Sequence, residues 1–313
     1  IFCGNVGSSS QAFVEYLTFR YTPTDQTIFK GIKKLLPGHY MVLSKDKIKI
    51  RKYWDIQTHG IESQSMQHHS EKILELLKDS VKKRLMSEVP LGAHLSGGLD
   101  SSIVVALMKT LMDTEVKTFS VAFDAEEPFN ESRYAKMLAE YYSTDHQEIT
   151  VKGDAIKYLP SVIWHLADLD SDPTIIAQYL LSELTKKKVT VVLTGEGADE
   201  LFGGYDEFRF LAYGKKYISA LPMPMRGIIA PIVNLTPNAL LDKYFHFASA
   251  LGEKGKEIFA DFIKNINNPE KSYMLLASFF TEDEKKYFTQ MRSIILRKRT
   301  KTTLNRLVHI LMA

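Results

Sequence analysis

The chain has 313 residues, of which 45% are hydrophobic, 25% charged and 11% aromatic, a globular composition that excludes disorder, collagen-like repeats and low complexity. Its 40 basic and 37 acidic residues leave a net charge of +3, too weak a bias to indicate a nucleic-acid partner. A single cysteine excludes an internal disulfide, and no apolar run approaches the roughly 18–20 residues of a membrane span. We therefore expect a soluble, cytoplasmic protein that binds neither nucleic acid nor a membrane.

The N-terminal part, residues 1–57, is rich in turn signals and short β-like pieces. Two strands are predicted, "GHYMVLS" (38–44) and "KIKIRKYW" (47–54), joined by a polar turn. Alternation in the second strand places Ile48 and Ile50 on one face and basic residues on the other. This pattern predicts a half-buried strand.

A polar, aperiodic segment, residues 58–70, follows and is predicted to be a linker. It contains His68 and His69, but adjacent side chains diverge and no third ligand is near, which favours a solvated linker over a metal site. From residue 71 the pattern changes. Hydrophobic residues recur at a spacing of three to four through residue 86, which predicts an amphipathic helix.

Strands and helices then alternate. Strands are predicted at 90–96, 117–123, 145–151 and 188–195, and helices at 101–112, 130–143 and 172–188. Asn130 is the expected N-cap of the second of these helices, and Asp172-Pro173 begins the third. The last strand is nearly all β-branched or apolar, as expected when both faces are covered. The alternation predicts an α/β fold with an open, mostly parallel sheet and helices on both faces.

Strand signals stop after Tyr205, and the rest of the chain carries mainly helical periodicity. The prolines of "LPMPMRGIIAP" (221–231) are expected to break the helices. We predict a helical subdomain or a helical extension of the sheet. Ordinary structural roles are expected for the other conspicuous residues: packing for Trp54 and Trp164, a structural role for His165, core for 244–247 and a solvated helix face for 296–301.

The loop "SGGLDSS" (96–102) lies between a predicted strand and the next helix, where open α/β sheets bind their ligands. Its glycines allow positive φ angles and close approach of phosphate oxygens, and the helix start offers unpaired N–H donors. Asp100 suits a polyanion only if a divalent cation such as Mg²⁺ lies between them. The loop predicts a cradle for a magnesium-loaded phosphate chain, although an ordinary glycine turn remains an alternative. It is neither a Walker A loop nor a dinucleotide-binding turn.

A second motif, "VVLTGEGADELFGGYDEF" (191–208), also follows a buried strand. It places Glu196, Asp199 and Glu200 among four glycines. Carboxylates gathered at the end of a strand suit metal ligation and proton handling, whereas the alternative is a solvated acidic turn. One sheet presents both motifs at the same edge, so each supports the interpretation of the other.

These motifs resemble those of a known family. "LSGGLDSS" resembles the pyrophosphate loop of the ATP pyrophosphatases, and "LTGEGADELFGGY" resembles the matching segment of glutamine-dependent asparagine synthetases. "YTPTDQTIFKGIKKLLPGHYMVL" and "KYWD" are similar to the end of that family's glutaminase domain. The resemblance covers roughly residues 13–208. It implies an adenine nucleotide alpha hydrolase-like fold, in which 1–57 is a remnant of the glutaminase domain and 71–313 is the synthetase domain, with an ATP-binding core at 71–208 and a mainly helical part at 209–313.

The resemblance also implies roles for individual residues. The pyrophosphate and Mg²⁺ loop falls on Ser96, Gly97, Gly98, Asp100, Ser101 and Ser102. Leu95 and Val121 match positions that hold adenosine, and Thr194 and Gly195 match a pair that contacts the nucleotide. Glu196 matches the catalytic glutamate tied to the acyl-adenylate intermediate, and Asp199 matches a second carboxylate on the Mg²⁺ side.

The implied reaction has two steps. The β-carboxylate of aspartate attacks the α-phosphorus of ATP, and ammonia then displaces AMP from β-aspartyl-AMP to give asparagine. The ammonia comes from glutamine in the full-length protein, and a homodimer is kept open as the assembly. Two alternatives remain: a related amidotransferase or cyclase acting on a sugar acid, a peptide or a β-amino acid, and a catalytically silent nucleotide-binding relative.

The sequence departs from the family at both ends. Family members begin with a nucleophilic cysteine, whereas Cys3 follows two residues and is expected to be a small buried residue. The glutamine-binding segments, an "ARVPFLD"-like stretch and a downstream lysine are not found before Ala313. We expect a chain truncated at both ends that binds ATP but does not hydrolyse glutamine, and whose turnover is in doubt.

Overall fold

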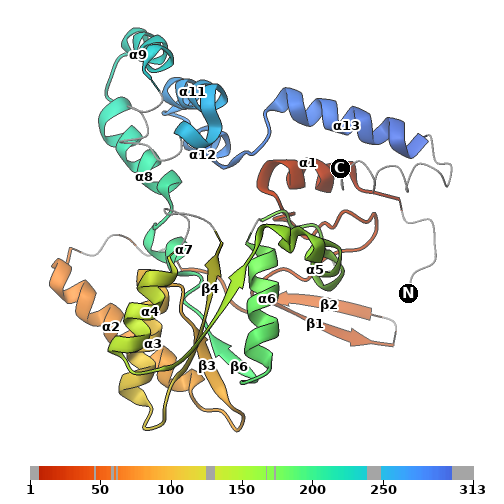
Figure 1. The fold of residues 1–313 in the computed structure, drawn as a ribbon. Coiled ribbons are helices and arrows are strands. Elements are labelled where there is room, and N and C mark those ends of the chain that lie inside the picture. The colour runs from red at the N-terminus through yellow and green to blue at the C-terminus, as the bar shows by residue number, and fades with distance from the viewer. Residues whose placement is uncertain are drawn as a thin grey trace. The chain divides into compact units, whose positions relative to one another are not determined.

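The computed structural model describes residues 7–45, 47–57, 60, 63–124, 131–166, 168–172, 174–237 and 248–297 (Figure 1). The chain divides into two compact units. The first, which we call the sheet unit, comprises Lys52–Ala167 and Ser171–Phe202. The second, the terminal unit, comprises Ile1–Arg51, Asp168–Asp170 and Gly203–Ala313. The expectations for Cys3, Asn130, Pro173, residues 244–247 and most of 296–301 fall outside the described residues.

The sheet unit is built on a four-stranded sheet of β3 (Leu91–His94), β4 (Lys117–Phe123), β5 (Asp145–Val151) and β6 (Val191–Leu193). The strand order is β5-β4-β3-β6, and every pairing is parallel. The chain runs outward from β3 to β5 and then returns to place β6 on the other side of β3. This confirms the predicted α/β fold and puts a topological switch point between β3 and β6.

The helices of the sheet unit are α2 (Met66–Arg84), α3 (Leu99–Leu111), α4 (Ser132–Tyr141), α5 (Leu159–Leu166), α6 (Ile175–Lys186) and α7 (Ala198–Phe202), with a 3₁₀ turn, η1 (Gly153–Tyr158). Residues of α2, α3 and α4 form one core with β3, around Met108 and Leu95. On β4, Phe119 packs on the opposite side with Leu181 of α6. Helices therefore cover both faces of the sheet, as predicted (Figure 1).

Helix α2 begins earlier than the sequence predicts. The Ser65 hydroxyl accepts a hydrogen bond from the His68 N–H at 3.1 Å, which is a good N-cap, so the last five residues of the predicted 58–70 linker are helical. Asp172 was expected to cap α6, but the N-cap is Thr174, and Asp172 lies two residues before it. Its carboxylate accepts hydrogen bonds from the Thr174 N–H at 2.9 Å and from the Thr174 hydroxyl at 2.6 Å.

The terminal unit contains α1 (Ser10–Phe19), the two-stranded sheet of β1 (His39–Ser44) and β2 (Lys47–Lys52), α8 (Asp206–Tyr213), a π-helical turn η2 (Gly214–Ile218), α9 (Met223–Leu235), α11 (Ala248–Asn265), α12 (Pro269–Ala277) and α13 (Glu282–Arg297). Phe262, Ile263 and Leu276 form its helical core. The prediction that the prolines of 221–231 break the helices is correct at Pro222, which lies between η2 and α9, but wrong at Pro231, through which α9 continues. A proline in the first turn, as Pro224 is, costs no helical hydrogen bond.

The β1-β2 hairpin is exposed on both faces. Every residue of β2 is exposed, including Ile48 at 64% and Ile50 at 57%, so the predicted half-buried strand is wrong. The packing expected of two tryptophans is wrong as well, because Trp54 is 59% exposed and Trp164 is 82% exposed. Alternation reveals which face of a strand is apolar, but a face is buried only where a second layer covers it. His165 is exposed, with its ring 5.9 Å from that of Tyr179.

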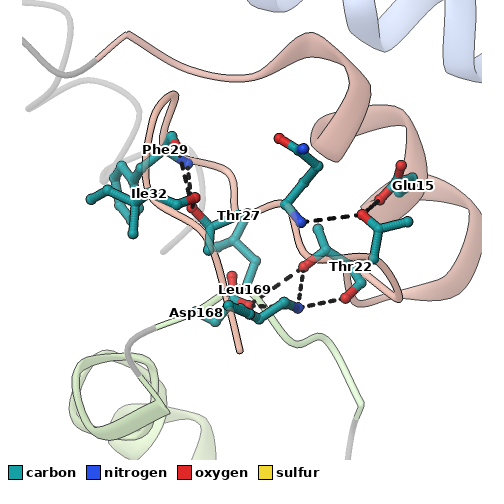
Figure 2. Close-up of polar contacts among 10 residues, drawn as sticks. Glu15, Thr22, Thr27, Phe29, Ile32, Asp168 and Leu169 are labelled. Carbon is teal, nitrogen blue, oxygen red and sulfur yellow. Dashed lines mark hydrogen bonds and ion pairs between the residues drawn. The ribbon is translucent and has the colours of Figure 1, made fainter. Parts of the chain in front are cut away.

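A buried polar network ties Asp168 to the N-terminal segment (Figure 2). Lys34 Nζ donates to the backbone oxygen of Thr22 at 2.5 Å, to its hydroxyl at 2.6 Å and to Asp168 Oδ2 at 3.2 Å. Thr22 is only 2% exposed. Asp168 Oδ1 accepts the N–H of Leu169 at 2.8 Å. This network joins residues 134 positions apart in the sequence and accounts for the grouping of Asp168–Asp170 with the N-terminal segment.

A search for membrane-spanning helices found none among the described residues, because no helix there is both long and apolar enough.

We expect Lys34→Met to lower the free energy of unfolding by about 1–3 kcal/mol, because it removes the cation that pairs with Asp168 and the donor to the two oxygens of the buried Thr22. The matched control is Lys33→Met. Lys33 pairs with Asp25 at 2.6 Å, but its side chain is 63% exposed, so little change is expected. Chemical denaturation of the two variants measures the difference. Equal stability of both variants would show that the network contributes nothing.

Candidate functional site

The candidate site lies at the carboxyl edge of the sheet, where the chain leaves β3 and β6. The register pairs Ala93 with Leu193, so both strands end side by side and their following loops start at the same height. Adjacent carboxyl ends at a topological switch point are where open α/β sheets bind ligands. The two motifs singled out in the sequence occupy these two loops.

The first loop has a shape that only glycine permits at one position. Gly97 has φ +90°, and a β-carbon there would lie 2.8 Å from the Ala135 amide nitrogen and 2.9 Å from Tyr134 Cβ. Gly98 has an ordinary φ of −70° and is the N-cap of α3 without any side-chain capping bond. The backbone conformation therefore does not require glycine at position 98. We attribute the glycine to access, because a residue without a side chain leaves the first N–H groups of the helix open.

The serine hydroxyls fold the loop onto itself. Ser101, which is 7% exposed, accepts the Ser96 N–H at 3.2 Å, and the Oγ atoms of Ser96 and Ser101 lie 3.0 Å apart. Ser102 Oγ donates to the Gly98 carbonyl at 2.5 Å. The sequence predicted these hydroxyls as donors to a ligand. The structure shows that Ser101 and Ser102 also hold the loop in shape.

The second loop touches the first. A β-carbon at Gly195 would lie 2.6 Å from the Ser101 amide nitrogen and 2.7 Å from the Asp100 carbonyl carbon, closer than any side chain can approach. Gly197 follows with φ +95° and turns the chain into α7, whose first turn carries Asp199 and Glu200. The bare Cα of Gly195 thus allows the two loops to pack backbone to backbone.

The two loops open into one cavity of about 570 Å³. It is lined by all of the sequence-predicted site residues except Gly97 and Ser102: Leu95, Ser96, Gly98, Asp100, Ser101, Val121, Thr194, Gly195, Glu196 and Asp199. Gly97 and Ser102 act on loop shape instead. The structure therefore brings Asp100 and Asp199 to a shared cavity, together with Glu196.

Sequence reasoning missed part of the wall. The additional lining residues are His94, Phe119, Ser120, Phe123, Glu131, Thr174, Ala177, Gln178 and Leu181. The members of this set at 174, 177, 178 and 181 form one face of α6, at a spacing of three to four residues. Gln178 Nε2 donates to Glu196 Oε1 at 3.3 Å. The helical spacing is visible in the sequence, but which face of the helix meets the cavity is not.

The cavity wall is strongly acidic. Among the described residues, four carboxylates line it, those of Asp100, Glu131, Glu196 and Asp199, and no lysine or arginine does. No group of three or more His, Cys, Asp or Glu side chains in the described part of the chain is placed to hold a metal ion. A polyanion in this cavity therefore needs a cation that completes its coordination with ligand oxygens, as Mg²⁺ commonly does with phosphates.

Two half-buried histidines lie in or beside this wall. Burial lowers the pKa of His94, whose Nε2 lies 3.3 Å from Thr185 Oγ1. Burial also lowers the pKa of His146, with Glu148 acting in the opposite direction. The His146 ring is held between two hydroxyls of β4, with Nδ1 2.9 Å from Thr118 Oγ1 and Nε2 3.1 Å from Ser120 Oγ.

A glycine loop and a group of carboxylates at the switch point of a parallel sheet define an α/β protein whose site is of the kind that binds polyphosphates. Comparison with protein families identifies which one. Residues 72–309 match the asparagine synthase family, and residues 4–54 match the glutamine amidotransferase domain. The chain belongs to the asparagine synthase family.

Individual relatives agree with this assignment. The chain is 28% identical over 316 aligned residues to the glutamine-hydrolyzing asparagine synthetase 1 of Bacillus subtilis, which covers 94% of this chain and 49% of the relative. It is 34% identical to a putative glutamine-hydrolyzing asparagine synthetase 2 of Methanocaldococcus jannaschii, covering 68% of this chain and 41% of the relative. It is 31% identical to amidase chyE of Penicillium rubens, in an alignment that covers 59% of this chain and 30% of the relative. The chain spans about half or less of the length of these relatives.

We expect Gly195→Ala to lower the free energy of unfolding by about 1–3 kcal/mol, because the new methyl group would push the two loops apart. The control is Gly153→Ala, where a β-carbon meets nothing within 4 Å. The effect is measured by comparing the chemical denaturation midpoints of the two variants. If Gly195→Ala proved as stable as the control, the loops would not be in the close contact described.

Stability should fall on acidification because of the two half-buried histidines. Their pKa values in the folded protein lie below the ordinary value of 6.5, so the unfolded chain binds protons more readily. The contribution is complete above 6.5 and is lost as the pH falls through 6.5 toward the folded pKa values. Thermal melting between about pH 8 and pH 5 tests this, with His146→Gln as the variant expected to flatten the decline. An unchanged decline in that variant would assign it to other groups.

Proposed function

We propose that this protein is an ATP-dependent ligase that forms an amide bond, acting like asparagine synthetase on aspartate. The observation that carries the proposal is the single cavity shared by the glycine loop, Asp100 and Asp199. Membership of the asparagine synthase family supports it. The relatives named asparagine synthetase support the choice of aspartate as acceptor.

The triphosphate is proposed to bind at the start of α3. The first N–H groups of a helix have no intrahelical partner, and no side chain caps them here, so phosphate oxygens can accept them. Ser96, Gly98 and Ser101, which line the cavity, would contact the pyrophosphate part, and Gly97 and Ser102 would hold the loop in the shape that binds it. Leu95, Val121, Thr194 and Gly195 would hold the rest of the nucleotide.

The residues present fit a magnesium ion. Asp100 and Asp199 line one cavity and supply hard oxygen ligands, and the described wall offers no lysine or arginine to balance a triphosphate. Asp100 and Asp199 would hold Mg²⁺, which would neutralise part of the charge of the polyphosphate.

In the first proposed step, a carboxylate oxygen of aspartate forms a bond to the α-phosphorus of ATP, and the bond to pyrophosphate breaks. The N–H groups at the start of α3 stabilise the negative charge of the departing pyrophosphate. In the second step, ammonia forms the C–N bond at the acyl carbon of β-aspartyl-AMP, and AMP departs. Glu196 orients the ammonia and accepts its surplus proton.

We further propose that residues 1–57 are the end of a glutaminase domain and that 71–313 is the synthetase domain, with 71–208 as the ATP-binding core and 209–313 as its helical part. The match of residues 4–54 to the glutamine amidotransferase domain supports this division. So does the exposed apolar hairpin, where Leu43 is 72% exposed, because the remainder of such a domain would cover it. In the whole protein, glutamine would supply the ammonia. A homodimer and a cytoplasmic location are part of the same proposal.

A different acceptor is the second candidate, because one relative is named an amidase and not an asparagine synthetase. The acceptor would then be a sugar acid, a peptide or a β-amino acid. A third outcome is a catalytically silent relative that binds the nucleotide without turnover.

Pyrophosphate release by the intact protein separates these functions. With ATP, Mg²⁺, ammonium and aspartate, we expect release that Asp100→Asn lowers at least about 100-fold, because the variant removes a cavity carboxylate that holds the metal. Asp113→Asn is the control, since this exposed residue lies just beyond the end of α3 and does not line the cavity.

Release with another acid but not with aspartate would favour the second candidate. Magnesium-dependent ATP binding without release for any acid would favour the silent relative. Failure to bind ATP would overturn the whole proposal.

A further inference from the structure

Gln178 is a cavity residue whose side chain contacts the proposed catalytic carboxylate. Its amide Nε2 donates to Glu196 Oε1 at 3.3 Å, and both side chains line the cavity. Among the described residues, no other side chain is hydrogen-bonded to the Glu196 carboxylate. The two residues lie 18 positions apart, on α6 and on the loop after β6.

Helix α6 gives Gln178 a fixed base. Ile175, Ala177, Leu180 and Leu181 are all buried, and Leu181 packs with Phe119 of the sheet. The backbone that carries Gln178 is therefore anchored on both sides. The side chains of Gln178 and Glu196 are both exposed, and the backbone before Glu196 is fixed by the close packing of Gly195 against Asp100 and Ser101. The hydrogen bond from the anchored amide therefore restricts the rotation that the Glu196 side chain retains about its own bonds.

The two partners of this hydrogen bond differ in charge, since Gln178 is a neutral donor and Glu196 is an acidic acceptor. An amide donor holds one carboxylate oxygen without adding charge, so the carboxylate keeps its capacity to accept a proton. Gln178 donates to Oε1 only, so Oε2 keeps its capacity to accept a further hydrogen bond or a proton. A lysine at this position would instead form an ion pair with the carboxylate. The ion pair would make the carboxylate a weaker acceptor for the surplus proton of the attacking ammonia.

We propose that Gln178 is a positioning residue for the amide-forming step, which it serves by holding Glu196 in the orientation that accepts ammonia. This inference rests on the proposed function. It concerns the second step alone, because the residues proposed to bind the triphosphate and its metal lie after β3 and after β6, and none lies on α6. Loss of Gln178 should therefore leave adenylation intact and let water compete with ammonia for the acyl-adenylate.

The test uses the intact protein with ATP, Mg²⁺, ammonium and whichever acceptor releases pyrophosphate. The amide formed and the pyrophosphate released are measured in the same reaction. In the unsubstituted protein the ratio of amide to pyrophosphate should lie near one. In Gln178→Leu we expect pyrophosphate release within about twofold of the unsubstituted rate, a ratio lowered about tenfold, and partial recovery of the ratio at high ammonium concentration.

Two further variants make the result specific. Gln178→Glu has the same length but places two carboxylates together, so it should also lower the ratio at alkaline pH and recover part of it as a shared proton restores a hydrogen bond at lower pH. Ser182→Ala is the matched control, one turn along α6, exposed and not lining the cavity. It should keep the ratio of the unsubstituted protein.

The outcomes separate the two proposals. If the unsubstituted protein releases no pyrophosphate with any acceptor, the proposed function fails and the role of Gln178 fails with it. If it is active and both Gln178 variants keep its ratio, only the positioning role is overturned. A parallel fall in pyrophosphate release and amide formation, with an unchanged ratio, would also overturn it, since that pattern indicates general damage to the site.

Discussion

The candidate site depends on one close contact, the bare Cα of Gly195 against the backbone of Asp100 and Ser101. The parallel pairing of β3 and β6 brings the two loops to the same edge, but pairing alone leaves room for side chains between them. Only glycine at 195 lets the second loop settle on the first turn of α3. The position of Asp199 relative to Asp100 follows from this contact, because α7 begins three residues after Gly195. The placement of Asp199 beside Asp100 therefore depends on the absence of a side chain at position 195.

The described lining of the cavity carries four carboxylates and no lysine or arginine. Mg²⁺, bound as proposed, would place positive charge between these carboxylates and the phosphates. Hydrogen bonds keep the loop in shape, because the hydroxyls of Ser101 and Ser102 both donate to the Gly98 carbonyl. Strain that a site needs is commonly held by the surrounding structure in this way.

The sequence predicts what depends on local pattern and misses what depends on tertiary neighbours. Alternating strands and helices predicted the parallel sheet, and small residues at strand ends predicted both loops. The predicted burial of β2 was wrong. Ile48 and Ile50 lie on one face of the strand, as the alternation predicts, but nothing in the described structure covers that face. The path of α9 through Pro231 reflects packing of the helical core, which local propensity does not include. Gln178 was missed because its helix reaches the cavity only through the fold, although its spacing was visible in the sequence.

The two compact units are tied together by the chain itself. The backbone enters the terminal unit for only three residues, Asp168–Asp170, between α5 and α6 of the sheet unit. Lys34 and Thr22 hold that short segment through Asp168. Two residues later, the Asp172 carboxylate accepts hydrogen bonds from Thr174, the N-cap of α6, which is the helix that carries Gln178. Without the N-terminal segment, Asp168 would lack the cation that pairs with it, a few residues before α6 begins.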